Sequence, residues 1–444
     1  MTRRRFIAAA IFLGALALRL AYVQALPGDK YLHAPHSDHE NYRHWAALLA
    51  ANRPVPPDIS IQQPVYAWLF AAVGNPGDGP ATMRRWHLAA GAAAPALLYL
   101  LAAPALGGRW SAFAALLYAA CPVIVFTDAT WSKEQLAVTG WLLVLLLLRS
   151  PHAGLRLLAL PLALFALGLR ELFIVPVLFA ALAWYAPQRA WLRLAVLTLL
   201  LALAVWGWGV AHTAARAGQP PQGFAEPLYV GVWPGTNILY SPPPFVRPGR
   251  IYEAVDWEAE TARRLGHHPS PTEENAYWLG QARAAFTAQP LAALRTMLLR
   301  VVTALWAGPL EDNYPYLVHY HASGVLPLLP PVWLLLALGL GGLLLWWRSG
   351  EQRAACRIVT GFLLGALLAP APFYLLERLR LPLFPALAVA AAMGLAVAPR
   401  LPRRWLLVYA AGVTVAVSPA LTACLSPAIL AGTRMGWRLF RQFG

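Results

Sequence analysis

Charged residues are scarce in this chain of 444 residues. Asp, Glu, Lys and Arg together make up 12% of it, about half the share found in a soluble globular protein. Cysteine is also rare: Cys121, Cys356 and Cys424 each lie inside or at the edge of an apolar run. This placement argues against a disulfide framework and against a metal–thiolate cluster. No glycosylation sequon and no sequence repeat is present.

Apolar residues dominate instead. They form 59% of the chain, and the mean hydropathy is +0.53. Runs such as Phe6–Leu26, Leu88–Leu106 and Leu326–Trp347 are long enough to cross ~30 Å of hydrocarbon. The first run is longer than the core of a signal peptide and lacks a clear small-residue cleavage site, so we interpret it as an anchor. The sequence thus predicts an all-α polytopic membrane protein.

We expect about 11 transmembrane helices, with further helices lying against the outer face of the membrane. The predicted spans are 6–26, 86–106, 110–126, 135–148, 155–169, 171–186, 191–211, 325–347, 355–376, 381–398 and 404–424. The stretch 155–186 could instead be a single tilted helix. Two spans broken at Arg170-Glu171 are favoured, because a single helix would move every later basic loop to the opposite side.

The net charge of +16 does not indicate nucleic-acid binding. The basic residues lie mostly in short loops between apolar runs, where they act as orientation signals and mark the cytoplasmic side. Arg84-Arg85 is an exception on the other side. The side of the C-terminus stays open, because the number of spans places it outside whereas Arg434, Arg438 and Arg441 favour the inside.

The spans divide the chain into three parts: residues 1–211 with a first outer loop at 27–85, an outer region at 212–324, and C-terminal helices at 325–444. Within the first loop, Ile61–Val73 is apolar but too short to span, so it is expected to lie along the interface. In the outer region, Ser270-Pro271-Thr272-Glu273 is typical of a helix start. Pro290 should end that helix.

The first outer loop carries a polar cluster, His36-Ser37-Asp38-His39-Glu40. Ser37 and Glu40 have the spacing of a capping box, so the cluster could simply start an interfacial helix. From Asp38 onward, Tyr42, Trp45 and Leu49 follow helical spacing. The capping interpretation does not explain Asp38 or the two histidines, and both interpretations stay open on local grounds.

Other charges lie at predicted outer turns, against the usual orientation rule. They are Asp128 and Lys133-Glu134, Arg170-Glu171, and Glu377-Arg378-Leu379-Arg380. Charges that break this rule close to the bilayer are candidates for function. If the helices pack as a bundle, these turns can converge near Asp38 and combine a carboxylate base with cations able to hold a phosphate. The alternative is that each pair is a local ion pair or a snorkelling side chain.

Four motifs together resemble the membrane-embedded glycosyltransferases of the GT-C superfamily. The resemblance is to the branch that uses polyprenyl-phosphate sugars, which includes protein mannosyltransferases and the aminoarabinose and Rgt-type lipopolysaccharide enzymes. The four matches are Asp38 followed by Tyr42 and Ala46, Gln63-Pro64-Val65-Tyr66, Ser132-Lys133-Glu134 after Cys121-Pro122, and Arg378-Leu379-Arg380-Leu381-Pro382. They extend over much of the chain in the expected order.

The resemblance implies that a sugar is transferred from a polyprenyl-phosphate carrier to a hydroxyl of a glycolipid, glycan or protein acceptor, with inversion. The protein would lie in a bacterial-type inner or plasma membrane, with its active site outside the cytoplasm. Asp38 would be the base, with a pKa raised by the low dielectric of a membrane-edge cavity. The other expected roles are acceptor orientation by Glu40, Asp128 or Glu134, phosphate binding by Arg378, Arg380, Lys133 and Arg170, and acceptor or sugar contacts by Tyr42, His39 and Tyr66.

No cofactor is required by these roles, although His36 and His39 could join the carboxylates to bind a divalent metal ion. Two other functions compete. An O-antigen ligase or polymerase should carry its essential Arg and His mainly in the large outer loop, whereas here the cations lie at short turns. A transporter or flippase should show charges near mid-membrane and matched halves. Arg19 is the only strongly ionisable residue well inside a predicted span, and it could snorkel.

Overall fold

A computed structural model describes residues 2–28, 38–53, 63–73, 81–130, 132–192, 224–247, 250–306 and 316–405, with isolated positions between 195 and 207 and at 308, 310, 312 and 407. Within these residues the secondary structure is helical, apart from an isolated bridge between Leu239 and Leu375. The predicted spans 191–211 and 404–424 fall largely outside the described residues. The three-part division of the chain stays a prediction.

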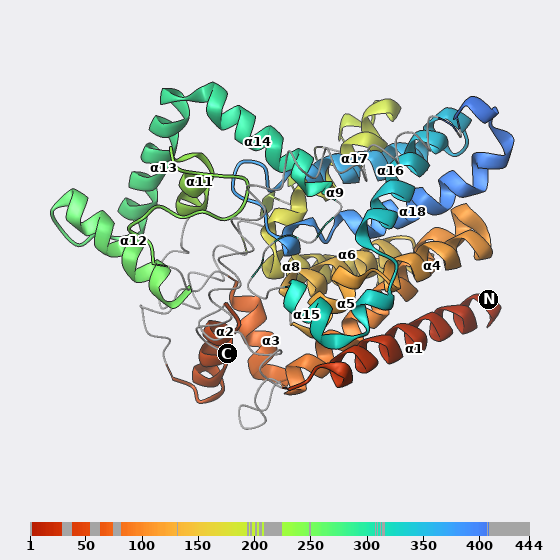
Figure 1. The fold of residues 1–444 in the computed structure, drawn as a ribbon, viewed down its shortest axis with the longest axis horizontal. Helices are drawn as coiled ribbons and strands as arrows, with labels where there is room; N and C mark the ends of the chain where they lie inside the picture. The colour runs from red at the N-terminus through yellow and green to blue at the C-terminus, as the bar shows by residue number, and fades with distance from the viewer. Residues whose placement is uncertain are drawn as a thin grey trace.

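Apolar helices form the main bundle, with α1 along one edge (Figure 1). The bundle helices are α1 (Thr2–Ala25), α4 (Ala81–Ala119), α5 (Pro122–Ala129), α6 (Lys133–Leu148), α7 (Ala153–Leu157), α8 (Ala159–Leu169), α9 (Ile174–Tyr185), α16 (Val332–Ser349), α17 (Arg353–Leu368) and α18 (Leu383–Val397). Short 3₁₀ turns flank them: η2 (Glu171–Phe173), η3 (Ala186–Gln188), η4 (Leu326–Leu328), η5 (Glu377–Arg380) and η6 (Ala398–Arg400).

Five described helices are long and apolar enough to cross a membrane, or six if the sharply bent pair α5 and α6 is one span. These findings fit a helical membrane protein. The predicted total of about 11 spans is not established.

Helix α4 is not one straight rod. Gly107 has φ 74° and ψ 166°, which interrupts the helix, and only glycine adopts such a conformation readily. Tyr99 packs in one cluster with Ala112 and Ala115, although 16 residues of straight helix would separate Tyr99 from Ala115 by about 24 Å. The chain therefore folds back at Gly107, between the two predicted spans 86–106 and 110–126.

The structure also decides between one helix and two in the stretch 155–186. Helix α8 ends at Leu169, and Arg170 is extended, with φ −158° and ψ 101°. The chain then re-enters helix through η2 and α9. The predicted break at Arg170-Glu171 is thus confirmed, and the single long helix is excluded.

Glycines allow close helix packing within the bundle. A Cβ atom at Gly394 of α18 would lie 2.1 Å from the Cα of Gly342 in α16, and one at Gly361 of α17 would lie 2.5 Å from the backbone oxygen of Phe179 in α9. Backbones that approach this closely leave no room for a side chain. Small residues at contacts between helices are typical of membrane bundles, where dispersion contacts replace the hydrophobic effect.

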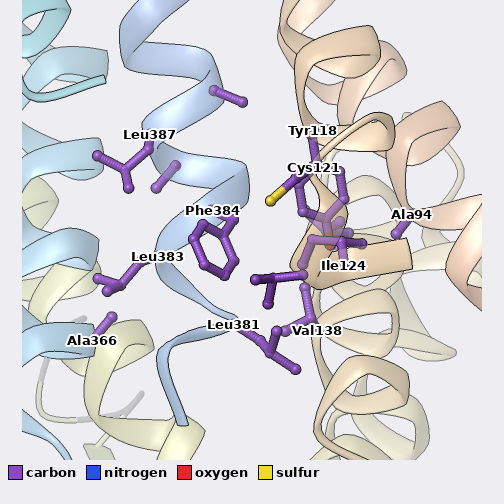
Figure 2. Close-up of a cluster of buried hydrophobic side chains, with 14 of the residues drawn as sticks. Ala94, Tyr118, Cys121, Ile124, Val138, Ala366, Leu381, Leu383, Phe384 and Leu387 are labelled. Atoms are coloured by element: carbon purple, nitrogen blue, oxygen red, sulfur yellow. The ribbon is translucent and has the colours of Figure 1, made fainter. Parts of the chain in front are cut away.

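A buried apolar cluster connects the start of α18 with α5 and α6. Phe384 points toward Cys121 and Ile124 across this cluster, and Leu381 lies beside Val138 (Figure 2). Leu381 and Phe384 are fully buried. Because Leu381 directly follows η5, the cluster holds η5 close to the N-terminal half of α6.

The remaining helices lie at one end of the bundle, which we call the site end (Figure 1). They are α2 (Asp38–Ala50), α3 (Pro64–Val73), α11 (Ala225–Val232), α12 (Arg250–Leu265), α13 (Pro271–Ala288), α14 (Pro290–Ala304) and α15 (Tyr316–Ser323). Asp38 heads α2, as predicted. The Ser270–Glu273 capping box is present with both of its hydrogen bonds, and α13 ends just before Pro290. Ser37 lies outside the described residues.

Arg300 fastens the α11–α14 segment to the bundle. Its guanidinium is fully buried and donates to the carbonyl oxygens of Gly231, Asn237 and Ala371. Ala371 belongs to the turn that leads into η5. Burial lowers the pKa of Arg300 to about 10, which still leaves it charged at neutral pH, so the carbonyl dipoles must stabilise the cation.

The partly buried carboxyl of Glu274 should make the stability of the α12–α13 pair depend on pH. Burial, together with the nearby Glu258, raises its pKa to about 7. The folded state therefore holds this proton more tightly than the unfolded state, and stability is lost as pH rises from about 4.5 to about 7. We expect Glu274→Gln to stabilise α13 by about 1 kcal/mol at pH 8, after a discount for solvent screening.

The measurement is amide hydrogen exchange of peptides from α13, with variant and parent compared at the same pH. At pH 4.5 the two should exchange alike, because both then carry a neutral side chain. A gain at pH 4.5 as large as the gain at pH 8 would contradict the assignment to Glu274.

Candidate functional site

Arg378 lies at the centre of the candidate site. It belongs to η5, and its guanidinium Nη1 donates to the Asp38 carboxylate at 3.0 Å. Its Nε lies 3.5 Å from Oδ1 of Asp312 and 3.7 Å from Oε1 of Glu134. The backbone N–H of Arg378 also donates to Asp312, at 2.9 Å. One arginine thus connects carboxylates from α2, α6 and the segment before α15.

Two further cations border this cluster. Nη1 of Arg170 lies 3.6 Å from the same Glu134 Oε1 that faces Arg378. The Lys133 ammonium donates to the Tyr42 hydroxyl at 2.8 Å and is almost fully buried. The structure therefore brings Asp38, Lys133, Glu134, Arg170 and Arg378 together from four separate segments of the chain. Their roles in a reaction stay predictions.

Tyr42 and Tyr66 form an aromatic wall beside the cations. Their rings meet edge to face with centroids 4.9 Å apart. The Tyr42 hydroxyl donates to Gln63 at 2.7 Å, and the Gln63 amide donates to Glu171 at 3.3 Å. The Tyr66 hydroxyl lies 2.9 Å from Nε2 of His87. This hydrogen-bonded chain holds the start of α3 against α2 and η2.

The cations and carboxylates of this cluster balance one another, but some of their contacts are too long to be hydrogen bonds. Burial alone would lower the pKa of Arg378, but the carboxylates of Asp312, Asp38 and Glu134 raise it well above its ordinary value. Three buried polar atoms nevertheless make no hydrogen bond among the described residues: Nε of Arg170, Nε of Arg378 and Oε1 of Glu134. Oε1 of Glu134 lies 3.6 Å from Nη1 of Arg170 and 3.7 Å from Nε of Arg378, and both contacts are longer than hydrogen bonds. Such groups call for a further partner.

The surroundings of Asp38 differ from the sequence-based expectation. That expectation placed the carboxylate at the edge of a low-dielectric cavity, with cations nearby to hold a phosphate. In the structure the guanidinium of Arg378 contacts this carboxylate directly, at 3.0 Å. Asp38 is 12% exposed, so it is mostly buried but still reaches solvent.

Arg380 does not fit its predicted role as a phosphate ligand. It is fully buried, and Nε and Nη2 donate to the two oxygens of Glu377 at 2.6 and 2.7 Å. Nη1 and Nη2 also donate to the carbonyls of Trp306 and Gly308. Burial raises the pKa of Glu377 despite its pairing with Arg380. Its donors are therefore already engaged and not free for a phosphate. Through these hydrogen bonds Arg380 connects η5 to the residues that follow α14.

Asp128 is also removed from the predicted site. Nε of Arg19 donates to its carboxylate at 2.6 Å, and both side chains are fully buried. A Cβ atom at Gly91 would lie 2.1 Å from Cγ of Asp128, so the pair packs directly against the α4 backbone. Snorkelling, which the sequence left open for Arg19, is not observed, because its guanidinium is buried inside the bundle.

Glu40 points elsewhere as well. It forms an exposed ion pair with Arg43, three residues later on α2, and not with Arg378 or Lys133 of the described cluster. The side chain of His39 and the whole of His36 lie outside the described residues. Within the described residues no group of three His, Cys, Asp or Glu side chains has the arrangement of a metal site.

Asp312 is the site residue that sequence reasoning missed. It follows Glu311 near the end of the long region 212–324, where a carboxylate in a loop carries no distinguishing pattern. The available signal was the presence of two adjacent acids just before α15, in a chain with few acids. Glu171 and Gln63 lie in segments that the sequence singles out, but their residue types alone predict no role for them.

Comparison with known proteins finds similarity among solved structures. No protein-family profile matches this chain, and no curated protein matches it. The fold is similar to the crystal structure of the Archaeoglobus fulgidus oligosaccharyltransferase in the apo form, with 16% sequence identity and a TM-score of 0.44. The match covers 98% of this chain, which spans 56% of that protein's length. At this similarity the likeness assigns no activity, so function must be argued from the residues themselves.

Proposed function

We propose that this protein is a glycosyltransferase that moves a sugar from a polyprenyl-phosphate carrier to a hydroxyl acceptor at the site end of the bundle. The observation that carries the proposal is the contact between Arg378 and Asp38. Arginine is a side chain that commonly binds phosphate. Of the two acids at the start of α2, Asp38 contacts Arg378, whereas Glu40 pairs with Arg43 at the surface. The motif resemblance to GT-C glycosyltransferases supports the same reaction class.

Arg378 has two alternative partners in this proposal. Without substrate it pairs with Asp38 and, more loosely, with Glu134 and Asp312. A bound phosphate offers a forked guanidinium two oxygens in a matching geometry. Transfer of Arg378 from Asp38 to the phosphate would free the Asp38 carboxylate to accept a proton. Substrate binding thereby activates the base.

The chemical step then balances without a cofactor. The acceptor hydroxyl gives its proton to Asp38 while its oxygen forms a bond to the anomeric carbon. The bond from that carbon to the phosphate oxygen breaks, and the electron pair leaves with polyprenyl phosphate. Attack opposite the leaving group inverts the anomeric centre. Arg378 and Arg170, with Lys133 nearby, would stabilise the charge that develops on the departing phosphate.

Tyr42 and Tyr66 suit the sugar or acceptor side of this site. Their edge-to-face pair lies next to Lys133, and aromatic faces combine an apolar surface with a polar hydroxyl. Glu134 is held between Arg378 and Arg170. In that position it orients both guanidinium groups and becomes their replaceable partner when phosphate enters. The acceptor could be a glycolipid, a glycan or a protein.

The proposal is tested with purified protein and a polyprenyl-phosphate sugar carrying a radiolabelled sugar. A glycosyltransferase releases unlabelled polyprenyl phosphate and moves the label to an acceptor supplied as envelope glycolipid. Turnover of a polyprenyl-diphosphate polymer instead would support the ligase or polymerase alternative. Movement of intact donor across a vesicle membrane, with no bond broken, would support a transporter. Either of these outcomes would overturn the proposal.

Replacement of Arg378 by lysine should weaken donor binding. Lysine keeps the charge but loses the planar fork, so one charged hydrogen bond to phosphate is lost, and we expect the KM for the donor to rise about tenfold. The matched control is Arg43→Lys, because Arg43 pairs with an acid at the surface of α2. Equal KM values for the parent and Arg378→Lys would contradict phosphate binding by Arg378.

A further inference from the structure

A second polar site lies far from Asp38, where α1 begins. A cavity of about 720 Å³ is lined there by Arg3, Arg4 and Ile7 of α1 and by Tyr99, Gly108, Arg109 and Ala112 of α4. Arg3 is separated from Ala25, at the other end of α1, by about 33 Å of helix. The cavity is therefore at the end of the bundle opposite the site end.

The cavity is built by the reversal of α4 at Gly107. This reversal brings Tyr99 of the first segment beside Ala112 of the second, and α1 packs against both. The second segment restarts directly after Gly107, so its first turn lines the cavity. The N–H groups of a first helical turn lack acceptors inside the helix and give it a positive character.

The charge of the cavity is of one sign. Arg3, Arg4 and Arg109 are exposed, and none of them forms an ion pair with another described residue. Arg109 instead lies over the ring of Trp110, 5.3 Å from its centroid. Three guanidinium groups around one hollow favour an anion, and forked donors suit phosphate oxygens.

Tyr99 supplies an independent sign of a ligand. Its side chain is fully buried, and its hydroxyl has no hydrogen-bond partner in the described structure. A Cβ atom at Gly108, which lines the cavity, would lie 3.7 Å from this hydroxyl. A buried hydroxyl without a partner is unfavourable, so a ligand oxygen that reached it would remove this penalty.

The surroundings of the cavity select a lipid rather than a free ion. Phe6 and Leu13 of α1 are 75% and 61% exposed, and in a membrane these apolar side chains face acyl chains. A ligand with an anionic phosphate and an apolar tail can occupy the arginine-lined hollow and continue along α1. Basic residues at the cytoplasmic face attract anionic lipids in the same way. We propose that this cavity binds the phosphate headgroup of an anionic phospholipid.

An orientation signal alone would explain the arginines, since such residues set topology by charge. It would not explain why they enclose a cavity, nor why a tyrosine hydroxyl is buried next to it without a partner. The two accounts differ in one measurable respect. A topology signal is used during insertion, whereas a binding site discriminates between lipids in the finished protein.

The test is competition between lipids in native mass spectrometry of the purified full-length protein. Phosphatidylglycerol should bind at least about tenfold more tightly than phosphatidylcholine with the same acyl chains, because a net charge is then paired with guanidinium groups. Arg109→Gln should abolish most of this preference. Arg156→Gln, which changes an exposed arginine of α7, should leave it intact.

Tyr99→Phe separates binding from folding. Loss of an unpartnered hydroxyl should leave the lipid-free protein as stable as the parent, yet weaken phosphatidylglycerol binding about threefold or more. Equal binding of the two lipids would overturn the proposal, as would an equal loss of preference in Arg156→Gln. Equal stabilisation by inorganic phosphate would also overturn it, since the acyl chains would then contribute nothing. Asp38→Asn should bind lipid normally whether or not the protein proves to be a glycosyltransferase.

Discussion

Asp38→Asn is expected to abolish sugar transfer. An amide cannot accept the acceptor proton, and general bases contribute about 10²–10⁴-fold to rate. Asparagine is almost the same size as aspartate, and its side-chain oxygen can still accept the hydrogen bond from Arg378 that Asp38 accepts at 3.0 Å. The substitution thus removes the base and leaves the geometry of α2 and η5 in place. The measurement is the rate of label transfer from a polyprenyl-phosphate sugar to envelope glycolipid.

Glu40→Gln is the matched control for this variant. It changes an acid of the same helix, two residues away, whose carboxylate pairs with Arg43 at the surface. Exposed pairs of this kind contribute at most about 1 kcal/mol, so transfer should stay close to the parent rate. If Asp38→Asn kept that rate, or if Glu40→Gln lost as much, Asp38 would not be the base.

Folding of both variants can be checked with two of the protein's own thiols, in a background where Cys424 is replaced by serine. Cys121 and Cys356 are free and buried, so a thiol-reactive dye labels them only as the bundle opens. An Asp38→Asn variant with an unchanged thermal transition and no transfer would separate catalysis from stability. An early transition would instead place Asp38 among the residues that hold α2 in position.

Local sequence patterns predicted local structure well. The start of α2 at Asp38, the Ser270–Glu273 cap and the break at Arg170 all depend on residues close together in sequence, and the structure shows all three. The predicted side of each turn also placed Lys133 and Arg378 at the same end of the bundle. That inference needed only the alternation of spans across a membrane, which charge and hydropathy encode.

Pairing between distant residues could not be predicted in the same way. Asp128 looked available from its sequence position, yet it is neutralised by Arg19, a partner that only helix packing brings close. Arg19 and Asp128 are 109 residues apart, and no periodicity connects them. Asp312 was missed for the same reason, because its contact with Arg378 joins residues 66 positions apart in the sequence.

The buried pair of Arg19 and Asp128 predicts the largest change in stability. Arg19→Met should destabilise the protein by about 3–5 kcal/mol, because it leaves a carboxylate buried without a cation. Asp128 has no space to move, since its Cγ would lie 2.1 Å from a Cβ atom at Gly91. The measurement is the thermal transition in detergent, followed by dye labelling of Cys121 and Cys356.

A double variant distinguishes a structural ion pair from a functional one. Arg19→Met combined with Asp128→Asn buries no charge, so it should recover a large part of the stability lost in Arg19→Met alone. Sugar transfer should recover along with stability, since neither side chain contacts the Arg378 cluster in the described structure. A stable double variant that does not transfer sugar would show that Asp128 takes part in catalysis. Additive losses would show instead that the two charges do not stabilise each other, contrary to a contact of 2.6 Å between fully buried groups.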